Sequence, residues 1–239
     1  ESFIDSIDLL EKTYDWINSN PLGSAAGYGV SIPLDREFVS SKLNFNRLQN
    51  NSLYVQNSRG KYELQIIASL KQIMLDIRKI AWDFSLFLSK EFNLIAIDKK
   101  YCTRSWIMPN KLKPDVIEIL RANYSILDGL SSELENILSL PSGYHRDLQL
   151  TKKSLIGAFA IVKKSSKVIP DLIKTLEINH IKSKEMVDDD MLMTERVFDL
   201  VNIGYPFRDA YHEIKNNNFV QSQNKESKKY SLGSPNNLN

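Results

Sequence analysis

Residues 61–90 read KYELQIIASLKQIMLDIRKIAWDFSLFLSK, and this stretch decides the fold. Neither glycine nor proline interrupts it. Apolar residues recur every three or four positions in one row, Ile67, Leu70, Met74, Ile77, Ala81, Phe84 and Leu88. A second row repeats every seven, Ile66, Ile73, Ile80 and Phe87. This spacing predicts a long helix whose apolar stripe is wider than a two-stranded seam, so we expect it to pack on more than one side.

The same spacing predicts two further long helices, over residues 115–140 and 152–176. In the first, Asn123 occupies an otherwise apolar position, and we expect it to be a hydrogen-bonded polar group rather than a ligand. In the second, Pro170 lies inside the pattern and predicts a bend. The start of the chain is also predicted to be helical, from the recurrence of Phe3, Ile7, Leu10, Tyr14 and Ile17.

The chain of 239 residues is therefore predicted to be all-α. Residues 1–178 are interpreted as part of a central helical-bundle domain and residues 179–215, with shorter amphipathic stretches at 183–192, 194–203 and 207–215, as a small helical domain. Residues 216–239 are rich in Asn, Ser and Lys and are predicted to be a flexible polar tail. Long helices with several apolar faces in so short a chain indicate a bundle completed by other subunits.

Composition narrows the class of protein. Hydrophobic residues make up 42% and charged residues 25%, which is typical of a soluble globular protein. A net charge of +2 argues against a nucleic-acid partner, and the apolar run 155–162 is too short to span a membrane. One cysteine, Cys102, excludes an internal disulfide and suits the cytoplasm. Three scattered histidines lack metal-ligand spacing.

Residue 1 is a glutamate, and the helical periodicity is already established within the first few residues. Neither a basic leader nor an apolar signal core is present at this end. We therefore expect this chain to be the C-terminal part of a longer protein.

The chemistry is expected in residues 102–118, CTRSWIMPNKLKPDVIE. A hydroxyl, Ser105, and two ammonium groups, Lys111 and Lys113, share one short loop. Neighbouring cations lower the cost of forming a serine alkoxide, and they also stabilise negative charge that develops on a substrate carboxylate. The simpler interpretation of Ser105 is a loop serine that caps the following helix.

Residues 104–113, RSWIMPNKLK, with Glu118 resemble the signature of the fumarase/aspartase superfamily, usually GSSxMPxKxN followed by Glu. The first serine, Met-Pro, the first lysine and the glutamate match. Two further segments are similar to argininosuccinate lyases: NPLGS at 20–24 with IPLDR at 32–36, and LPSGYHRDLQ at 140–149 with Lys152. In family order, the resemblance covers most of the chain.

The resemblance implies cleavage of argininosuccinate to arginine and fumarate by anti elimination, without a metal or organic cofactor. It also implies a homotetramer whose long helices form a central bundle and whose active sites are shared between subunits. The implied site residues are Ser105 as the base and Lys111 as its electrostatic support, with Lys113, Tyr144, Gln149 and Lys152 binding substrate. The proton-donating histidine motif of the family is absent from this chain, so the piece alone is expected to be inactive.

Three departures from the signature leave alternatives open. Arg104 replaces a glycine, Trp106 a small serine and Lys113 the substrate-binding asparagine. A catalytically impaired homologue that serves as a structural bundle is one alternative, and a sister lyase such as adenylosuccinate lyase is another. Tyr144 and Lys152 could also be packing and solvated residues. The glycines at 23, 27 and 29 suggest a turn near the active site rather than a phosphate loop.

Overall fold

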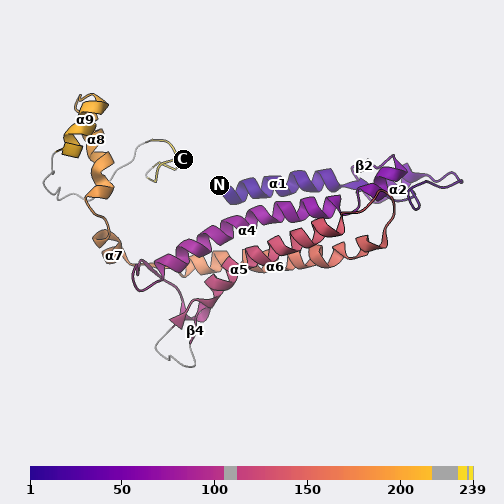
Figure 1. Cartoon of the computed structure of the whole chain (residues 1–239), viewed down its shortest axis with the longest axis horizontal. Coiled ribbons are helices and arrows are strands. Elements are labelled where there is room, and N and C mark those ends of the chain that lie inside the picture. The colour runs from indigo at the N-terminus through magenta and orange to yellow at the C-terminus, as the bar shows by residue number, and fades with distance from the viewer. Residues whose placement is uncertain (105–111, 217–230, 236, 239) are drawn as a thin grey trace. The chain divides into compact units, whose positions relative to one another are not determined.

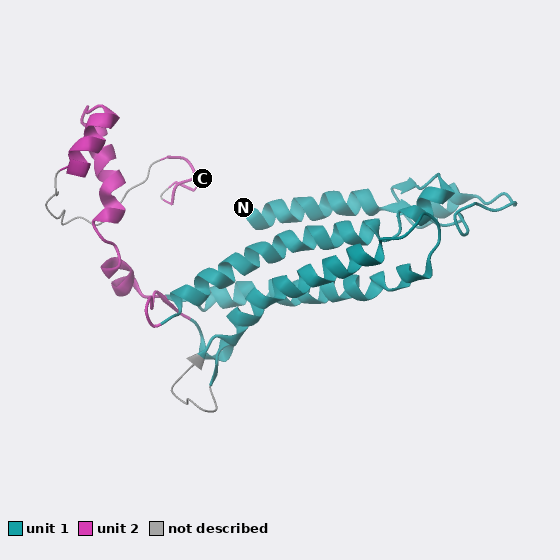
Figure 2. Cartoon of the chain, viewed as in Figure 1, with its two compact units in different colours: residues 1–89, 97–177 teal, residues 90–96, 178–239 magenta. Residues whose placement is uncertain are grey.

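The structure, a computed structural model, describes residues 1–104, 112–216, 231–235 and 237–238. The chain divides into two compact units, unit 1 with residues 1–89 and 97–177 and unit 2 with residues 90–96 and 178–239 (Figure 2). Helices dominate the described part of both units, which confirms the all-α fold class.

Four long helices build unit 1 (Figure 1): α1 (Ser2–Ile17), α4 (Lys61–Phe87), α5 (Asp115–Ile137) and α6 (Thr151–Lys174). They confirm the helices predicted from periodicity. Helices α4 and α5 end slightly before the apolar pattern does. The pattern extends further because Leu88 and Leu138, which follow the two helices, still pack against the core. Helix α6 continues through Pro170.

One glycine, Gly60, is required where the start of α4 meets the end of α5. Gly60 precedes α4 with a φ of +82°, in the left-handed region that glycine adopts without strain. A Cβ atom at this position would lie 1.9 Å from the Leu138 side chain. Both the backbone angle and this close approach therefore require glycine where α4 begins.

Helices α4, α5 and α6 enclose one continuous apolar core. Its members from α4 are buried as the first apolar row predicts, and Ile67, Met74 and Ile77 are 0% exposed. The second row also packs against this core through Ile66, Ile73 and Ile80. The remaining buried members come from α5 and α6, namely Ile117, Leu120, Leu127, Leu134, Ala158, Val162, Ile169 and Leu172.

One polar pair crosses this core. The Asn123 side-chain amide of α5 donates a hydrogen bond to Ser165 Oγ of α6 over 3.1 Å, and Ser165 is buried. The interpretation of Asn123 as a hydrogen-bonded core group is therefore confirmed, since its polarity is satisfied across the helix interface.

Helix α1 packs on α4 through polar side chains as well as through Leu10 and Trp16. Thr13 and Ser69 share a buried 2.8 Å hydrogen bond, and Ser2 donates to Asp76 over 2.6 Å. Ile7 and Tyr14 of the predicted apolar stripe are 52% and 62% exposed. Much of that stripe therefore points away from α4, and unit 1 does not cover it.

Short elements connect the long helices. Strands β1 (Ser19–Asn20) and β2 (Arg47–Leu48) pair in parallel. The other short elements of unit 1 are α2 (Arg36–Lys42), α3 (Ser52–Asn57), η1 (Lys99–Tyr101), β4 (Thr103–Arg104), β5 (Leu112–Lys113) and η2 (Arg146–Gln149). Side-chain caps begin several of them, such as Asp35, which accepts from the Phe38 amide of α2.

Unit 2 contains shorter helices. Its elements are β3 (Ile95–Ala96), α7 (His180–Glu185), η3 (Asp190–Leu192), α8 (Met193–Asn202) and α9 (Phe207–Asn216), and β6 (Glu177–Ile178) lies at the boundary between the units. Helices α8 and α9 share a small core of Val197, Ala210 and Ile214. Residues 90–96 join this unit because Asn179 donates hydrogen bonds to the carbonyls of Leu94 and Asn93.

The amphipathic stretch 183–192 does not form a single helix. Helix α7 begins earlier because the Asn179 side chain caps it by accepting from the Lys182 amide, and it ends at Glu185. A new turn then starts where Asp188 accepts from the Met191 amide. The turn at Asp188 thus separates two short helical elements within a stretch whose apolar spacing is continuous. Across the described ranges, no helix combines the length and apolarity needed to cross a membrane.

Candidate functional site

The two ends of the signature loop lie side by side. Strands β4 and β5 pair antiparallel, with Thr103 opposite Lys113 and Arg104 opposite Leu112. The Thr103 hydroxyl also donates to the Asp115 carboxylate at the start of α5. Lys113 is thereby held, partly buried, at the N-terminal end of α5. Three predicted residues, Ser105, Trp106 and Lys111, fall outside the described part of the chain.

Cys102 lies just before this strand pair and is not a candidate nucleophile. Burial raises the pKa of its thiol, and the nearby carboxylates of Asp115 and Asp98 raise it further. Because the thiolate is the reactive form, Cys102 stays protonated near neutral pH.

The second group of predicted residues lies in the connection from α5 to α6 and in the first turn of α6. The Lys152 ammonium donates to Gln149 Oε1 over 3.2 Å, so the structure brings these two side chains together. Tyr144 is 51% exposed, and its ring centroid lies 5.3 Å from the Arg59 guanidinium. The turn before Tyr144 is held by Asn57, which accepts from the Gly143 amide over 2.8 Å. All three predicted side chains are exposed and could meet a substrate.

The structure does not bring Lys113 and Tyr144 together. Lys113 precedes α5 and Tyr144 follows it, and the helix of 23 residues is about 34 Å long. Figure 1 shows β4 and the turn from α5 to α6 at opposite ends of unit 1. One small-molecule substrate therefore cannot touch both groups in the same copy of the chain.

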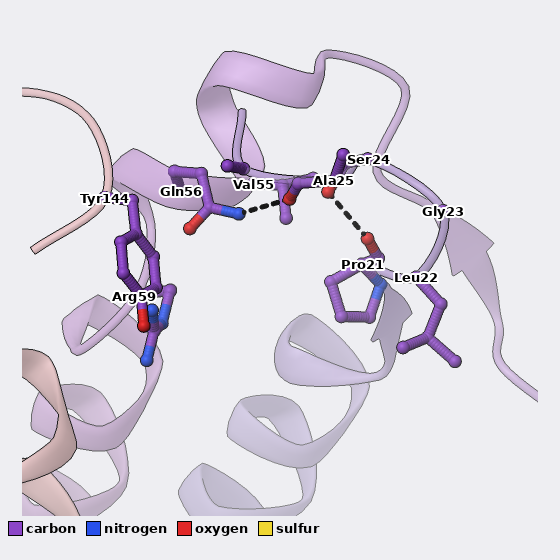
Figure 3. A pocket seen from close by; sticks show the side chains of 10 residues that line it. Pro21, Leu22, Gly23, Ser24, Ala25, Val55, Gln56, Arg59 and Tyr144 are labelled. Carbon is purple, nitrogen blue, oxygen red and sulfur yellow. Dashed lines mark hydrogen bonds between the residues drawn. The ribbon is translucent and has the colours of Figure 1, made fainter. Parts of the chain in front are cut away.

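A cavity of about 520 Å³ lies beside Tyr144 (Figure 3). One wall is the glycine-containing segment 21–26, in which Gly23 has a φ of +81°. The opposite wall contains Val55, Gln56, Arg59 and Tyr144. The expected turn thus lies next to one of the predicted substrate-binding residues.

Hydrogen-bonding side chains hold this wall in place. Arg36 donates from Nε to the Leu22 carbonyl over 2.8 Å and from a terminal nitrogen to the Gln49 carbonyl over 2.7 Å. The Gln56 side-chain amide donates to the Ala25 carbonyl over 2.9 Å (Figure 3). Because side chains satisfy these loop carbonyls, the segment keeps one shape without regular secondary structure.

Two cavity residues, Gln56 and Arg59, were not identified from the sequence. Both precede α4, far from Tyr144 along the chain, and no motif spacing relates them to it. Only the packing of α4 beside α5 brings them to Tyr144. An arginine in a short connection between two helices is a weak sequence signal.

Nearby, a tyrosine pair stands where α3 leads into α4. Gln49 donates from Nε2 to Tyr62 Oη over 2.9 Å and to Ser19 Oγ over 2.8 Å. Burial raises the pKa of Tyr62, but hydrogen bonds with Tyr54, Ser19 and Arg47 outweigh it, so the net pKa is lowered. The hydrogen bond with Tyr62 raises the pKa of Tyr54. Both phenols serve as hydrogen-bonding groups here.

Comparisons with known proteins give a consistent picture. A family model described as "Lyase" matches residues 4–125. The argininosuccinate lyase of Xanthomonas campestris pv. campestris is 44% identical over 211 residues, which cover 88% of this chain and 49% of that protein. That of Stenotrophomonas maltophilia matches with the same identity and coverage. The chain spans about half the length of the curated relatives it matches.

Solved structures share the fold. EDDS lyase in complex with formate superposes with a TM-score of 0.73 at 22% identity, over 88% of this chain and 42% of that one. A class II fumarase from Schistosoma mansoni gives a TM-score of 0.72 at 16% identity, over 90% of this chain and 53% of that one. At these identities, the likeness establishes the long-helix fold alone.

Proposed function

Because the chain belongs to the lyase family, whose model matches half of it, we propose that it forms part of an argininosuccinate lyase. The 44% identity to argininosuccinate lyases over 211 residues carries this proposal. The complete protein would cleave argininosuccinate to arginine and fumarate in the cytoplasm, as a step of arginine biosynthesis.

The proposed chemistry is an elimination through a carbanion. Ser105 removes the proton beside a substrate carboxylate, and that carboxylate then carries a second negative charge. Lys111 and Lys113 supply ammonium groups that favour both the serine alkoxide and this charged intermediate. Lys113 can donate hydrogen bonds, but it lacks the acceptor that an asparagine would provide. Tyr144, Gln149 and Lys152 bind the rest of the substrate.

The length of α5 supports a site that is shared between copies of the chain. Lys113 precedes and Tyr144 follows this 23-residue helix, which is about 34 Å long, so a site that uses both takes them from different copies. The exposed apolar residues of α1, such as Ile7 and Tyr14, provide a surface for such association. We infer a homotetramer with shared active sites.

Replacement of the proposed base tests the reaction. In the complete protein, Ser105→Ala is expected to lower the rate of fumarate release from argininosuccinate by about 10²- to 10⁴-fold, because general-base catalysis contributes that much. The release is followed by absorbance. Ser125→Ala, an exposed serine on α5, is the control and should leave the rate unchanged. Undiminished turnover by Ser105→Ala would show that another group is the base.

Mixing two inactive variants tests the shared site. Ser105→Ala and Tyr144→Ala disable opposite ends of α5. After random reassembly, roughly a quarter of the composite sites receive two intact ends, so activity should return to about that fraction. If both ends came from one copy, mixing would restore nothing.

A catalytically impaired homologue remains the second candidate, since Arg104, Trp106 and Lys113 depart from the signature. At one of these three positions, the structure weakens the argument for impaired activity. Arg104 lies in β4, where the extended backbone is open to any residue, so a glycine is not needed there. Reverting all three residues to Gly, Ser and Asn would raise turnover sharply if they impair it. Assaying adenylosuccinate in parallel identifies a sister lyase.

A further inference from the structure

The first turn of α6 carries two lysines, Lys152 and Lys153, at a helix end that already has positive character. Unpaired backbone amides point out of the start of a helix, so a carboxylate is favourable there and a cation is not. Helix α6 has no acidic residue in its own first turn, and among the described residues no side chain caps its N-terminus. The negative charge that stabilises this end therefore has to come from another element.

Glu133 of the neighbouring helix α5 supplies that charge. Its carboxylate accepts a 2.9 Å hydrogen bond from Ser154 Oγ and lies 3.4 Å from the Lys153 ammonium. Ser154 is 0% exposed, so the carboxylate is anchored at a fixed point of α6. The hydrogen bond from Ser154 lowers the pKa of Glu133 from its ordinary value, and Lys153 lowers it further, against the opposing effect of burial. Glu133 is therefore ionised near neutral pH, next to the start of α6.

Small residues bring the two helices close together beside this contact. Ala158, one turn after Ser154, is 0% exposed. At Gly157, an added Cβ atom would lie 3.3 Å from the Leu130 side chain of α5, which is closer than an ordinary van der Waals contact. An interface packed this closely leaves α6 little freedom to rotate about its own axis. The directions of the side chains in its first turn are therefore set by the contact with α5.

The two adjacent lysines have different surroundings. Lys153 has Glu133 as its counter-ion. Lys152 has no carboxylate partner within the described part of the chain, and it donates to the neutral amide oxygen of Gln149 over 3.2 Å. Successive residues point about 100° apart around a helix, so the pairing of Lys153 with α5 directs Lys152 to another side. Lys152 is therefore the ammonium of this turn that is available to an anionic group.

We propose that Glu133 is a positioning residue, which pairs with Lys153 and anchors the first turn of α6 so that Lys152 presents its ammonium to a substrate carboxylate. This proposal rests on the proposed function, in which Lys152 binds substrate. Without the charge of Glu133, both lysines are uncompensated cations that compete for the same carboxylate in different geometries. Without Lys153, the Glu133 carboxylate is left to pair with Lys152, the other ammonium of the turn. Loss of either member of the pair therefore weakens substrate binding.

Kinetics of the complete protein test this pairing. Glu133→Gln and Lys153→Met are each expected to raise the KM for argininosuccinate by about 3- to 10-fold and to leave kcat within about 2-fold, the combined scale of an exposed ion pair and a charge at a helix end. In the double variant the KM should return to within about 1.5-fold of the wild type. The reason is that the glutamine oxygen can still accept from Ser154, while neither a second cation nor a carboxylate competes for Lys152.

The matched control is Glu135→Gln. Glu135 lies on the same helix but accepts its 3.2 Å hydrogen bond from Ser131 of α5 itself, so its replacement should leave the KM unchanged. A role in folding alone predicts a different pattern, because two losses of stability add and the double variant would then be the most impaired. Unchanged KM values in both single variants, or a double variant no better than the single ones, overturn the proposal.

Binding of the two products separates this proposal from the proposed function. Fumarate and arginine both carry carboxylates, and calorimetric titration with them does not depend on turnover. Weaker binding of either product to Glu133→Gln, restored in the double variant, supports the positioning role even if argininosuccinate is not cleaved. Equal binding of both products by the wild type and Glu133→Gln contradicts it even if the wild-type protein is an active lyase. A complete protein that binds neither product and does not cleave argininosuccinate overturns both proposals.

Discussion

Helix α4 makes two different interfaces, one with α5 and α6 and one with α1. Toward α5 and α6 it presents fully buried aliphatic side chains such as Ile67 and Ile77. Toward α1 it presents Ser69 and Asp76, which form hydrogen bonds with Thr13 and Ser2. The apolar stripe of α1, including Ile7, remains exposed.

The interface of α4 with α5 and α6 stabilises a single copy of the chain, whereas the exposed face of α1 is available for association. Burial of aliphatic side chains drives the three-helix core, because each fully buried large side chain contributes about 1.5–3 kcal/mol. Paired hydroxyls contribute less, about 0.5–1.5 kcal/mol for each hydrogen bond. Helix α1 is therefore expected to be less firmly attached than α5 and α6, and its exposed outer face is available for the association proposed above.

The largest effect on stability is expected from the three-helix core. Leu134→Ala on α5 removes a side chain that is 0% exposed and should lower the free energy of unfolding by about 2–5 kcal/mol, through lost burial and a residual cavity. Urea unfolding followed by circular dichroism measures this. Ile7→Ala on α1 is the counterpart, and in dilute protein it should cost no more than about 0.5 kcal/mol. Equal losses of unfolding free energy in the two variants would contradict the proposed difference between the two interfaces.

Protein concentration sharpens the same comparison. If copies associate through α1, the cost of Ile7→Ala should grow as the protein becomes more concentrated, whereas the cost of Leu134→Ala should change little.

A smaller effect is expected from the polar interface. Thr13→Val keeps the shape of the side chain and removes its 2.8 Å hydrogen bond with Ser69. Ser69 still donates to the Gln65 carbonyl, so the loss should be about 1 kcal/mol in the free energy of unfolding. Ser132→Ala, at an exposed position of α5, is the control and should have no effect. A loss as large as that of Leu134→Ala would mean that hydroxyl pairing, not aliphatic burial, dominates in α4.

The smallest effect concerns pH and an ion pair at the edge of the core. Lys71 of α4 and Asp128 of α5 lie 2.5 Å apart, with side chains 25% and 52% exposed. The hydrogen bond with Asp128 raises the pKa of Lys71 above 10.5, against the opposing effect of burial. A raised pKa means that the folded state holds the proton more tightly, so this contribution is complete below pH 10.5 and is lost as pH rises through the folded pKa.

Comparison of the wild type with Lys71→Met measures that contribution. The difference in the free energy of unfolding should be at most about 1 kcal/mol at pH 8, and it should shrink above about pH 10.5. Lys79→Met, an exposed lysine of the same helix, is the control and should show no such dependence. A difference that grows with pH would contradict the assignment.

Local spacing predicted much of the fold. The three-four pattern of residues 61–90 predicted α4 and its buried face, and the polar Asn123 in an apolar row was correctly interpreted as a hydrogen-bonded group. The same reasoning did not locate the helix ends around 183–192, where Asn179 caps the earlier start of α7 and Asp188 begins a new turn. Caps depend on one side chain and one amide, so an amphipathic average conceals them.

The candidate site was predicted only in part. Motif resemblance selected Lys113, Tyr144, Gln149 and Lys152, and the structure places Gln149 beside Lys152. It did not select Arg59, because a motif lists residues close in sequence, whereas Arg59 meets Tyr144 through the packing of α4 on α5. The roles of all these residues stay predictions until the variants are measured.

The sequence by itself determined the long helices, their apolar faces and the family segments, because the helical period relates residues three and four apart. Only the tertiary structure decided which segments meet. It separated Lys113 from Tyr144 by the length of α5, placed Arg59 against Tyr144, and turned part of the apolar stripe of α1 outward. The physical reason is that the distance between segments depends on how whole helices pack, which the period of a single helix does not encode.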